Sequence, residues 1–152
     1  MPRPDATVDV SPHALEAIHQ HALETYPHEC CGALLGDADA ARIVSALPLP
    51  NTTEEGPRRR FLIRPADYRA AEQQAGGAGL SLIGFYHSHP DHPARPSQHD
   101  LDHAWPNFHY VIASVLDRRV DDVRTWHLRD DRSAFDERRL VVSTDAADAA
   151  RT

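Results

Sequence analysis

The pattern of apolar and polar positions predicts a chain of helices and buried strands, in which several strands follow one another directly. Ser11-Pro12 is typical of a helix start, with serine as N-cap and proline at the first helical position. One apolar stripe follows at helical spacing before Pro27 ends the helix: Leu15, Ile18, Ala22, Leu23 and Tyr26. Apolar runs and breakers predict the remaining elements. Residues 1–10 are expected to form a frayed or edge-strand lead-in. Strands are expected over 29–36, 42–49, 80–86, 108–116, 120–128 and 135–142, with a further strand entered through 58–63, and helices over 65–74 and 98–105.

Length and composition favour one domain with a single core. The chain has 152 residues, and 26% of them are charged, an ordinary fraction for a globular protein. We expect residues 1–142 to form this domain. Residues 143–152 are rich in alanine and aspartate and are expected to be a disordered tail.

The charge balance and the cysteines exclude several partners and compartments. A net charge of −7 leaves no basic surplus for phosphates, so nucleic acid is not expected as a partner. No apolar run is long enough to span a bilayer, and the N-terminus lacks the apolar core of a signal peptide, so no membrane is expected either. Cys30 and Cys31 are adjacent and poorly placed to pair with each other, which favours a reduced, cytoplasmic protein. The oligomeric state is not predicted.

One constellation, H-x-H-x7-S-x-x-D, carries the candidate chemistry. His87 and His89 end an apolar strand, where side chains two apart point to the same face. Prolines then turn the chain, and Ser97 opens a helix as N-cap with Asp100 in its first turn. Two imidazoles and one carboxylate, with a fourth position left for water, are the ligands of a catalytic zinc site. We therefore expect His87, His89 and Asp100 to hold one Zn²⁺.

These residues resemble the JAMM motif of the MPN-plus metallopeptidases, which pairs the constellation with an upstream glutamate. Glu29, in Pro27-His28-Glu29-Cys30-Cys31-Gly32, resembles the stretch that carries this glutamate in bacterial members. The resemblance covers about residues 8 to 142. It implies an α/β fold in three layers, similar to cytidine deaminases, with a central mixed β-sheet flanked by helices.

The resemblance also implies a mechanism and a substrate class. Glu29 is expected to move the proton of the attacking water, and the hydroxyl of Ser97 to stabilise the oxyanion. Compact bacterial members imply a ubiquitin-like sulfur-carrier protein as substrate and partner, cleaved after its C-terminal diglycine to release cysteine or a short extension. Two alternatives stay open: an isopeptidase that removes a ubiquitin-like modifier from lysine, and a scaffold that binds partners without metal.

Other motifs are weaker or absent. The sequence has no H-E-x-x-H and no P-C-x-x-C, which disfavours zincins and zinc deaminases. Cys31 in an apolar strand is typical of a structural cysteine rather than of a nucleophile. His99 and His103 are four apart on a predicted helix and form a possible second metal pair without a third ligand. Arg58–Arg60 is the one basic cluster, and it is either a solvated charge run or a contact for an acidic partner.

Overall fold

The computed structural model describes residues 7–51 and 63–143, and within these ranges it has three helices and seven strands. In chain order the elements are β1 (Thr7–Val10), α1 (Pro12–Thr25), β2 (Cys31–Asp37), β3 (Arg42–Leu49), α2 (Pro65–Gly77), β4 (Ser81–Pro90), α3 (Gln98–Asp102), β5 (His109–Leu116), β6 (Arg119–Leu128) and β7 (Phe135–Val142). The predicted arginine cluster and the strand entered through 58–63 lie outside the described residues, apart from Ile63, as does the predicted tail apart from Ser143.

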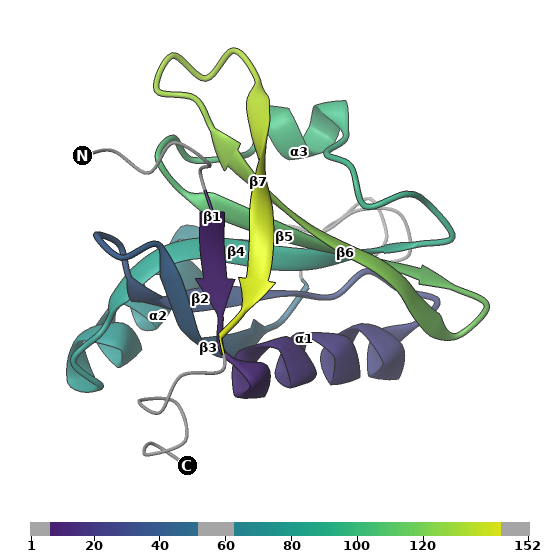
Figure 1. Ribbon diagram of the computed structural model, residues 1–152, viewed down its shortest axis with the longest axis horizontal. Coiled ribbons are helices and arrows are strands. Elements are labelled where there is room, and N and C mark those ends of the chain that lie inside the picture. Colours follow the sequence, from purple (N-terminus) through teal and green to yellow (C-terminus); the bar gives the residue numbers. More distant parts are fainter. Residues whose placement is uncertain (1–6, 52–62, 144–152) are drawn as a thin grey trace.

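The strands form one mixed sheet that closes on itself in the order β1-β3-β2-β4-β5-β6-β7. Strands β4 and β5 are parallel neighbours, and β1 pairs in parallel with both β3 and β7. Figure 1 shows β1 and β7 side by side where the sheet closes. The predicted mixed sheet is confirmed. Its closure was not predicted, and three layers describe it incompletely, because a barrel separates an inner from an outer face.

Helix α1 covers the inner core. Ser11 is its N-cap, and the Ser11 hydroxyl accepts a hydrogen bond from the backbone N–H of Ala14 at 3.0 Å. The buried stripe of α1 is Ala14, Ile18 and Ala22, whereas Leu23, which we expected in that stripe, is 42% exposed. The inner cluster draws side chains from every strand, including Val8, Leu34, Ile43, Tyr86, Val111, Val123 and Leu140.

Helix α2 covers the outer face of β2 and β4. There Ala71 and Ala75 of the helix belong to a second apolar cluster with Cys31, Ala33, Leu35, Phe85 and Tyr110. Strand β4 is therefore buried from Ile83 onward, which explains its unbroken apolar run up to Tyr86, directly before the two histidines. No helix in the described ranges is long and apolar enough to cross a membrane.

Candidate metal centre and active site

Strand β4 delivers both histidines to one point on the outer face. His87 lies between Cys31 of β2 and Ile112 of β5, so neighbouring strands fix its backbone from both sides. His87 and His89 alternate with Tyr86 and Ser88, and they share the outer face with Phe85. Both imidazoles are buried, with exposures of 1% and 8%. The predicted convergence of the two histidines is confirmed.

Helix α3 adds the carboxylate through its N-terminal cap. The backbone N–H of Asp100 donates to the hydroxyl of Ser97 at 3.1 Å, and the backbone N–H of Ser97 donates to Asp100 Oδ2 at 2.8 Å. This reciprocal pair is a capping box, and it holds the buried Asp100 carboxylate toward β4. The helix ends at Asp102, shorter than the predicted range, with His103 as its C-cap.

Three ligand atoms form a nearly equilateral triangle. His87 Nε2, His89 Nε2 and Asp100 Oδ2 are each 3.2 Å from the other two. Ligand atoms about 2.05 Å from a tetrahedral zinc ion lie roughly 3.4 Å apart, so this spacing fits zinc. Within the described part of the chain, these residues make up the one grouping of three or more histidine, cysteine or acidic side chains placed to hold a metal ion. The pair of His99 and His103, with rings 4.2 Å apart, belongs to no such grouping there.

The surroundings set the protonation states that a metal requires. His89 Nδ1 lies 2.8 Å from the carbonyl oxygen of Pro93, so Nδ1 carries the proton and donates it, which leaves the Nε2 lone pair to face the triangle. Burial lowers the pKa of His87, which keeps this imidazole neutral. Burial alone would raise the pKa of Asp100, but His87 and His89 together hold it below its ordinary value. The site thus offers neutral nitrogen donors and one anionic oxygen.

Glu29 lies just before β2, two residues ahead of Cys31. Cys31 pairs with His87, and the carbonyl of Cys30 accepts the Ser88 N–H, so the backbone that directly follows Glu29 lies against the strand that carries both histidines. The residue is 9% exposed, and the amide of Asn51 donates to its backbone carbonyl at 3.0 Å.

An apolar cavity of about 240 Å³ adjoins the metal ligands. His87 and Asp100 form part of its wall, and the other lining residues are Ile63, Pro65, His103, Ala104, Trp105 and Tyr110. Trp105 packs against Tyr68 and Phe85 at ring distances of 5.1 and 5.3 Å. Sequence reasoning did not find this pocket, because its walls come from four separate segments.

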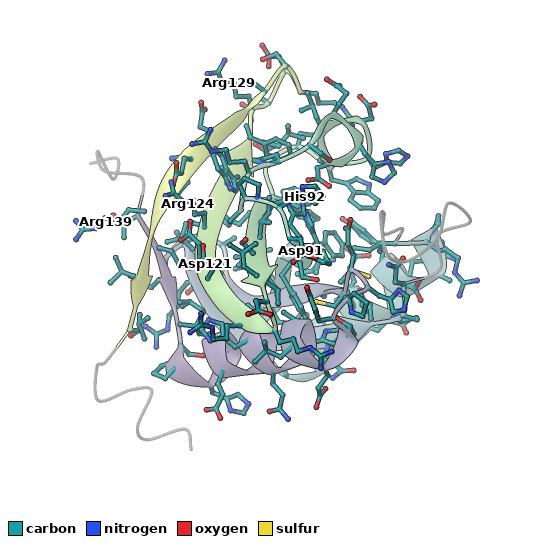
Figure 2. All side chains as sticks on the ribbon, turned by 90° about the vertical axis from the view of Figure 1, so that its right-hand side faces the viewer. Asp91, His92, Asp121, Arg124, Arg129 and Arg139 are labelled. Carbon is teal, nitrogen blue, oxygen red and sulfur yellow. The ribbon has the colours of Figure 1, made fainter. Side chains whose placement is uncertain are left out.

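A second hollow lies beside the loop that follows β4. The cavity measures about 230 Å³, and Figure 2 shows Asp91 and His92 of the loop facing it with Asp121 and Arg124 of β6. Asp91 has a left-handed backbone with φ 61°, and its carboxylate accepts from the Tyr26 hydroxyl at 2.8 and 3.0 Å. This contact ties the end of α1 to the loop that positions His89.

The adjacent cysteines do not supply a nucleophile. Both are free and buried, and burial raises the pKa of Cys30 to about 11 and that of Cys31 to about 12. Thiols with such pKa values are protonated near neutral pH and are weak nucleophiles. The structural role expected for Cys31 agrees with its place in the outer cluster.

Comparison with known proteins relates the chain to metallopeptidases. A family model described as prokaryotic homologs of the JAB domain matches residues 11–129. The desampylase of Haloferax volcanii is 37% identical over 66% of this chain and 76% of its own length. A probable TtuB-protein conjugate cleaving protease of Thermus thermophilus is 36% identical over 64% of each chain. The CysO-cysteine peptidase of Mycobacterium tuberculosis is 27% identical over 76% of this chain and 79% of its own.

Solved structures agree with this relationship. A solution structure of a Salinibacter ruber protein superposes with a TM-score of 0.71, at 40% identity, covering 91% of this chain and 94% of that one. A JAB1/MPN domain protein from Archaeoglobus fulgidus, at 19% identity, has a TM-score of 0.56 over 88% of this chain and 99% of that one. The latter likeness concerns the fold alone.

Proposed function

Because the chain belongs to the prokaryotic JAB-domain family, whose members include JAMM-type metallopeptidases, we propose that it hydrolyses the amide bond after the C-terminal diglycine of a small ubiquitin-like protein. The observation that carries this proposal is the triangle of His87, His89 and Asp100, with Glu29 two residues before Cys31, the strand partner of His87. The relatives support the substrate class, since one is described as a probable TtuB-protein conjugate cleaving protease and another as a CysO-cysteine peptidase.

In this proposal His87, His89 and Asp100 hold one zinc ion. Zinc supplies Lewis-acid chemistry, activating water for attack and polarising a carbonyl group. Glu29 takes the proton from the attacking water and returns it to the departing amine, so one carboxylate acts as base and then as acid. Glu29 is only 9% exposed, so little bulk water reaches its carboxyl group to exchange the proton between the two steps.

Ser97 is proposed to stabilise the developing oxyanion. Its hydroxyl oxygen accepts the capping bond from Asp100, which leaves the hydroxyl proton to be donated outward. The residue is exposed at the start of α3, so a substrate carbonyl can reach it. The same serine therefore serves two purposes: it orients the Asp100 carboxylate and offers one hydrogen-bond donor at the reaction centre.

The apolar cavity is proposed to receive a residue that flanks the scissile bond. Its lining from Trp105, Tyr110 and Ile63 suits an apolar or aliphatic group beside the metal ligands. Our preferred substrate is a sulfur-carrier protein that ends in an added cysteine or a short extension. The compact connection between α3 and β5, only residues 103–108, supports this choice because it leaves little chain to grip a second folded protein.

An isopeptidase is the second candidate. The higher identities, 37% and 36%, are to the desampylase and the conjugate-cleaving protease, compared with 27% for the cysteine peptidase. In that case the cavity would hold the aliphatic stem of a lysine side chain joined to the diglycine carboxyl group. Both candidates use the same metal centre and the same proton transfers.

The test uses two substrates made from one ubiquitin-like carrier of the same organism. One carries a cysteine after its diglycine, and the other is joined to the Nε atom of a lysine in a peptide. Each is incubated with zinc-loaded protein, and the intact mass is recorded with a chelator control and with Glu29→Gln. A matched control is Glu16→Gln, on the exposed side of α1, which should retain full activity.

Loss of one cysteine residue, abolished by chelator and by Glu29→Gln, would support the carrier hydrolase. Release of the lysine peptide with the same sensitivity would support the isopeptidase. If neither substrate is cut by a folded, zinc-containing sample, the proposed reaction is wrong. Equal cleavage of unrelated peptides would refute the ubiquitin-like substrate class.

A further inference from the structure

A polar cluster lies on the inner face of the barrel, away from the metal centre. Its members are His109 on β5, Thr125 and His127 on β6, and Arg138 on β7. His109 pairs with His127, and Thr125 pairs with Arg138, so three adjacent strands bring these side chains together. Strand alternation sets them on the face of inner-core residues such as Val111 and Leu140. His87 and His89 face the opposite side of the sheet.

Of the two histidines in this cluster, only His127 has a ring nitrogen within hydrogen-bond distance of another member of the cluster. Arg138 Nη2 lies 3.4 Å from His127 Nδ1, and the rings of His109 and His127 are 5.0 Å apart. Three other buried atoms have no hydrogen-bond partner among the described residues: His109 Nδ1, Thr125 Oγ1 and Arg138 Nε. Thr125 is completely buried, with 0% exposure. Buried polar atoms in folded proteins are nearly always paired, so three orphans in one place indicate a missing partner.

The charge of the cluster favours an anion as that partner. Arg138 is half-buried, and no described carboxylate lies within ion-pair distance of it. The nearest acidic side chains along β7 are engaged elsewhere, Asp136 with Arg129 at 2.9 Å and Glu137 with Arg124 at 3.1 Å. Arg138 interacts with Asp136 at longer range, but that carboxylate is hydrogen-bonded to Arg129, so an anion would give Arg138 a direct charge-assisted hydrogen bond that water does not. The same charge excludes a metal cation.

We propose that Arg138, Thr125 and His109 bind a small tetrahedral oxyanion, inorganic phosphate or sulfate, at this end of the barrel. Arg138 donates through Nε, Thr125 through its hydroxyl, and His109 through Nδ1. The ligand is small, because the donors come from neighbouring positions on adjacent strands. This site is independent of the proposed peptidase reaction, since it lies on the other face of the sheet.

Titration with inorganic phosphate at constant pH tests the site directly. Metal-free protein is used so that phosphate cannot bind zinc, and the ring nitrogens of His109 and His127 are followed by ¹⁵N NMR. We expect saturable shifts of both rings at up to millimolar phosphate. Arg138→Gln should weaken binding about tenfold or more, because it removes a charge-assisted hydrogen bond.

Arg139→Gln is the matched control. Arg139 is the next residue on β7, is exposed, and points away from the barrel in Figure 2. Its removal should leave the phosphate affinity unchanged, which separates a specific site from general attraction to arginine. If Arg138→Gln does not fold, Thr125→Val keeps the shape of the side chain, removes only the hydroxyl, and should weaken binding several-fold.

Two results would overturn the proposal. One is the absence of saturable shifts at His109 and His127, which would mean that water or another part of the chain satisfies these groups. The other is an equal loss of phosphate affinity in Arg138→Gln and Arg139→Gln, which would mean that phosphate is attracted to any arginine on this strand rather than bound at one site. Neither readout depends on peptidase activity, so the inactivity of the enzyme would not decide this question.

Discussion

His109→Gln is expected to make the fold less sensitive to acid. Burial, reinforced by the nearby His127 and Arg138, lowers the pKa of His109 from 6.5 to about 4. The folded state therefore binds fewer protons at this site than the unfolded chain between these two values. The stability due to His109 is fully present above pH 6.5 and is lost as the pH falls toward 4. Between about pH 7.5 and pH 5, the linkage amounts to roughly 2 kcal/mol of unfolding free energy.

Urea unfolding at these two pH values measures the effect. The free energy of unfolding of the parent protein should fall by about 2 kcal/mol more than that of His109→Gln over this interval. Only this difference matters, since the substitution also changes packing at both pH values. Buffers free of phosphate and sulfate keep any oxyanion from raising the pKa of His109.

His13→Gln is the control for this experiment, because His13 is exposed at the start of α1. This variant should follow the parent protein at both pH values. If His109→Gln loses as much stability between them as the parent does, then His109 is not a neutral buried imidazole, and the reasoning fails.

Three further predictions concern the site and its support. Glu29→Gln should lower kcat by roughly 10²–10⁴-fold, and Ser97→Ala by less, while both keep their zinc by elemental analysis. Gly32→Ala should lower the free energy of unfolding by about 1–3 kcal/mol in urea, because an added Cβ would overlap the buried ring of Tyr86. Tyr26→Phe should weaken zinc binding in a chelator competition, by less than the roughly 10–100-fold typical of a lost hydrogen bond to a ligand.

Each of these has a result that would count against it. Full activity of zinc-loaded Glu29→Gln would remove Glu29 as the base. Gly77→Ala is the control for the glycine prediction: a Cβ there meets nothing within 4 Å, so this helix substitution should be neutral or stabilising. For Tyr26→Phe, zinc affinity equal to that of the parent would show that its contact with Asp91 does not position the His89 loop.

The metal ligands could be predicted because their geometry is local. His87 and His89 share a face through the two-residue period of a strand, and Asp100 is fixed by a capping box within four residues of Ser97. The spacing of these residues along the chain therefore determines their arrangement in space. Glu29 is different: it lies in a loop segment distant in sequence, and only the family resemblance drew attention to it.

Features that depend on pairing between distant strands could not be predicted in the same way. Closure of the barrel depends on β1, four residues long, pairing in parallel with both β3 and β7. The metal-adjacent cavity combines Ile63, α3 and Tyr110. The cluster of His109, Thr125 and Arg138 is visible only once β5, β6 and β7 are in register. Sequence gives each strand its apolar pattern, but not its neighbours.

The parallel pairing of β4 and β5 explains why the metal centre forms where it does. Parallel neighbours require a connection that leaves the end of one strand and returns to the start of the next, so it must cross one face of the sheet. The inner face is already filled by α1 and the apolar side chains of all seven strands. The connection therefore crosses the outer face, where α3 brings Asp100 to the histidines at the end of β4. A side chain that blocked the close approach of β4 and β5, at Gly84 for example, would displace the ligands without touching them.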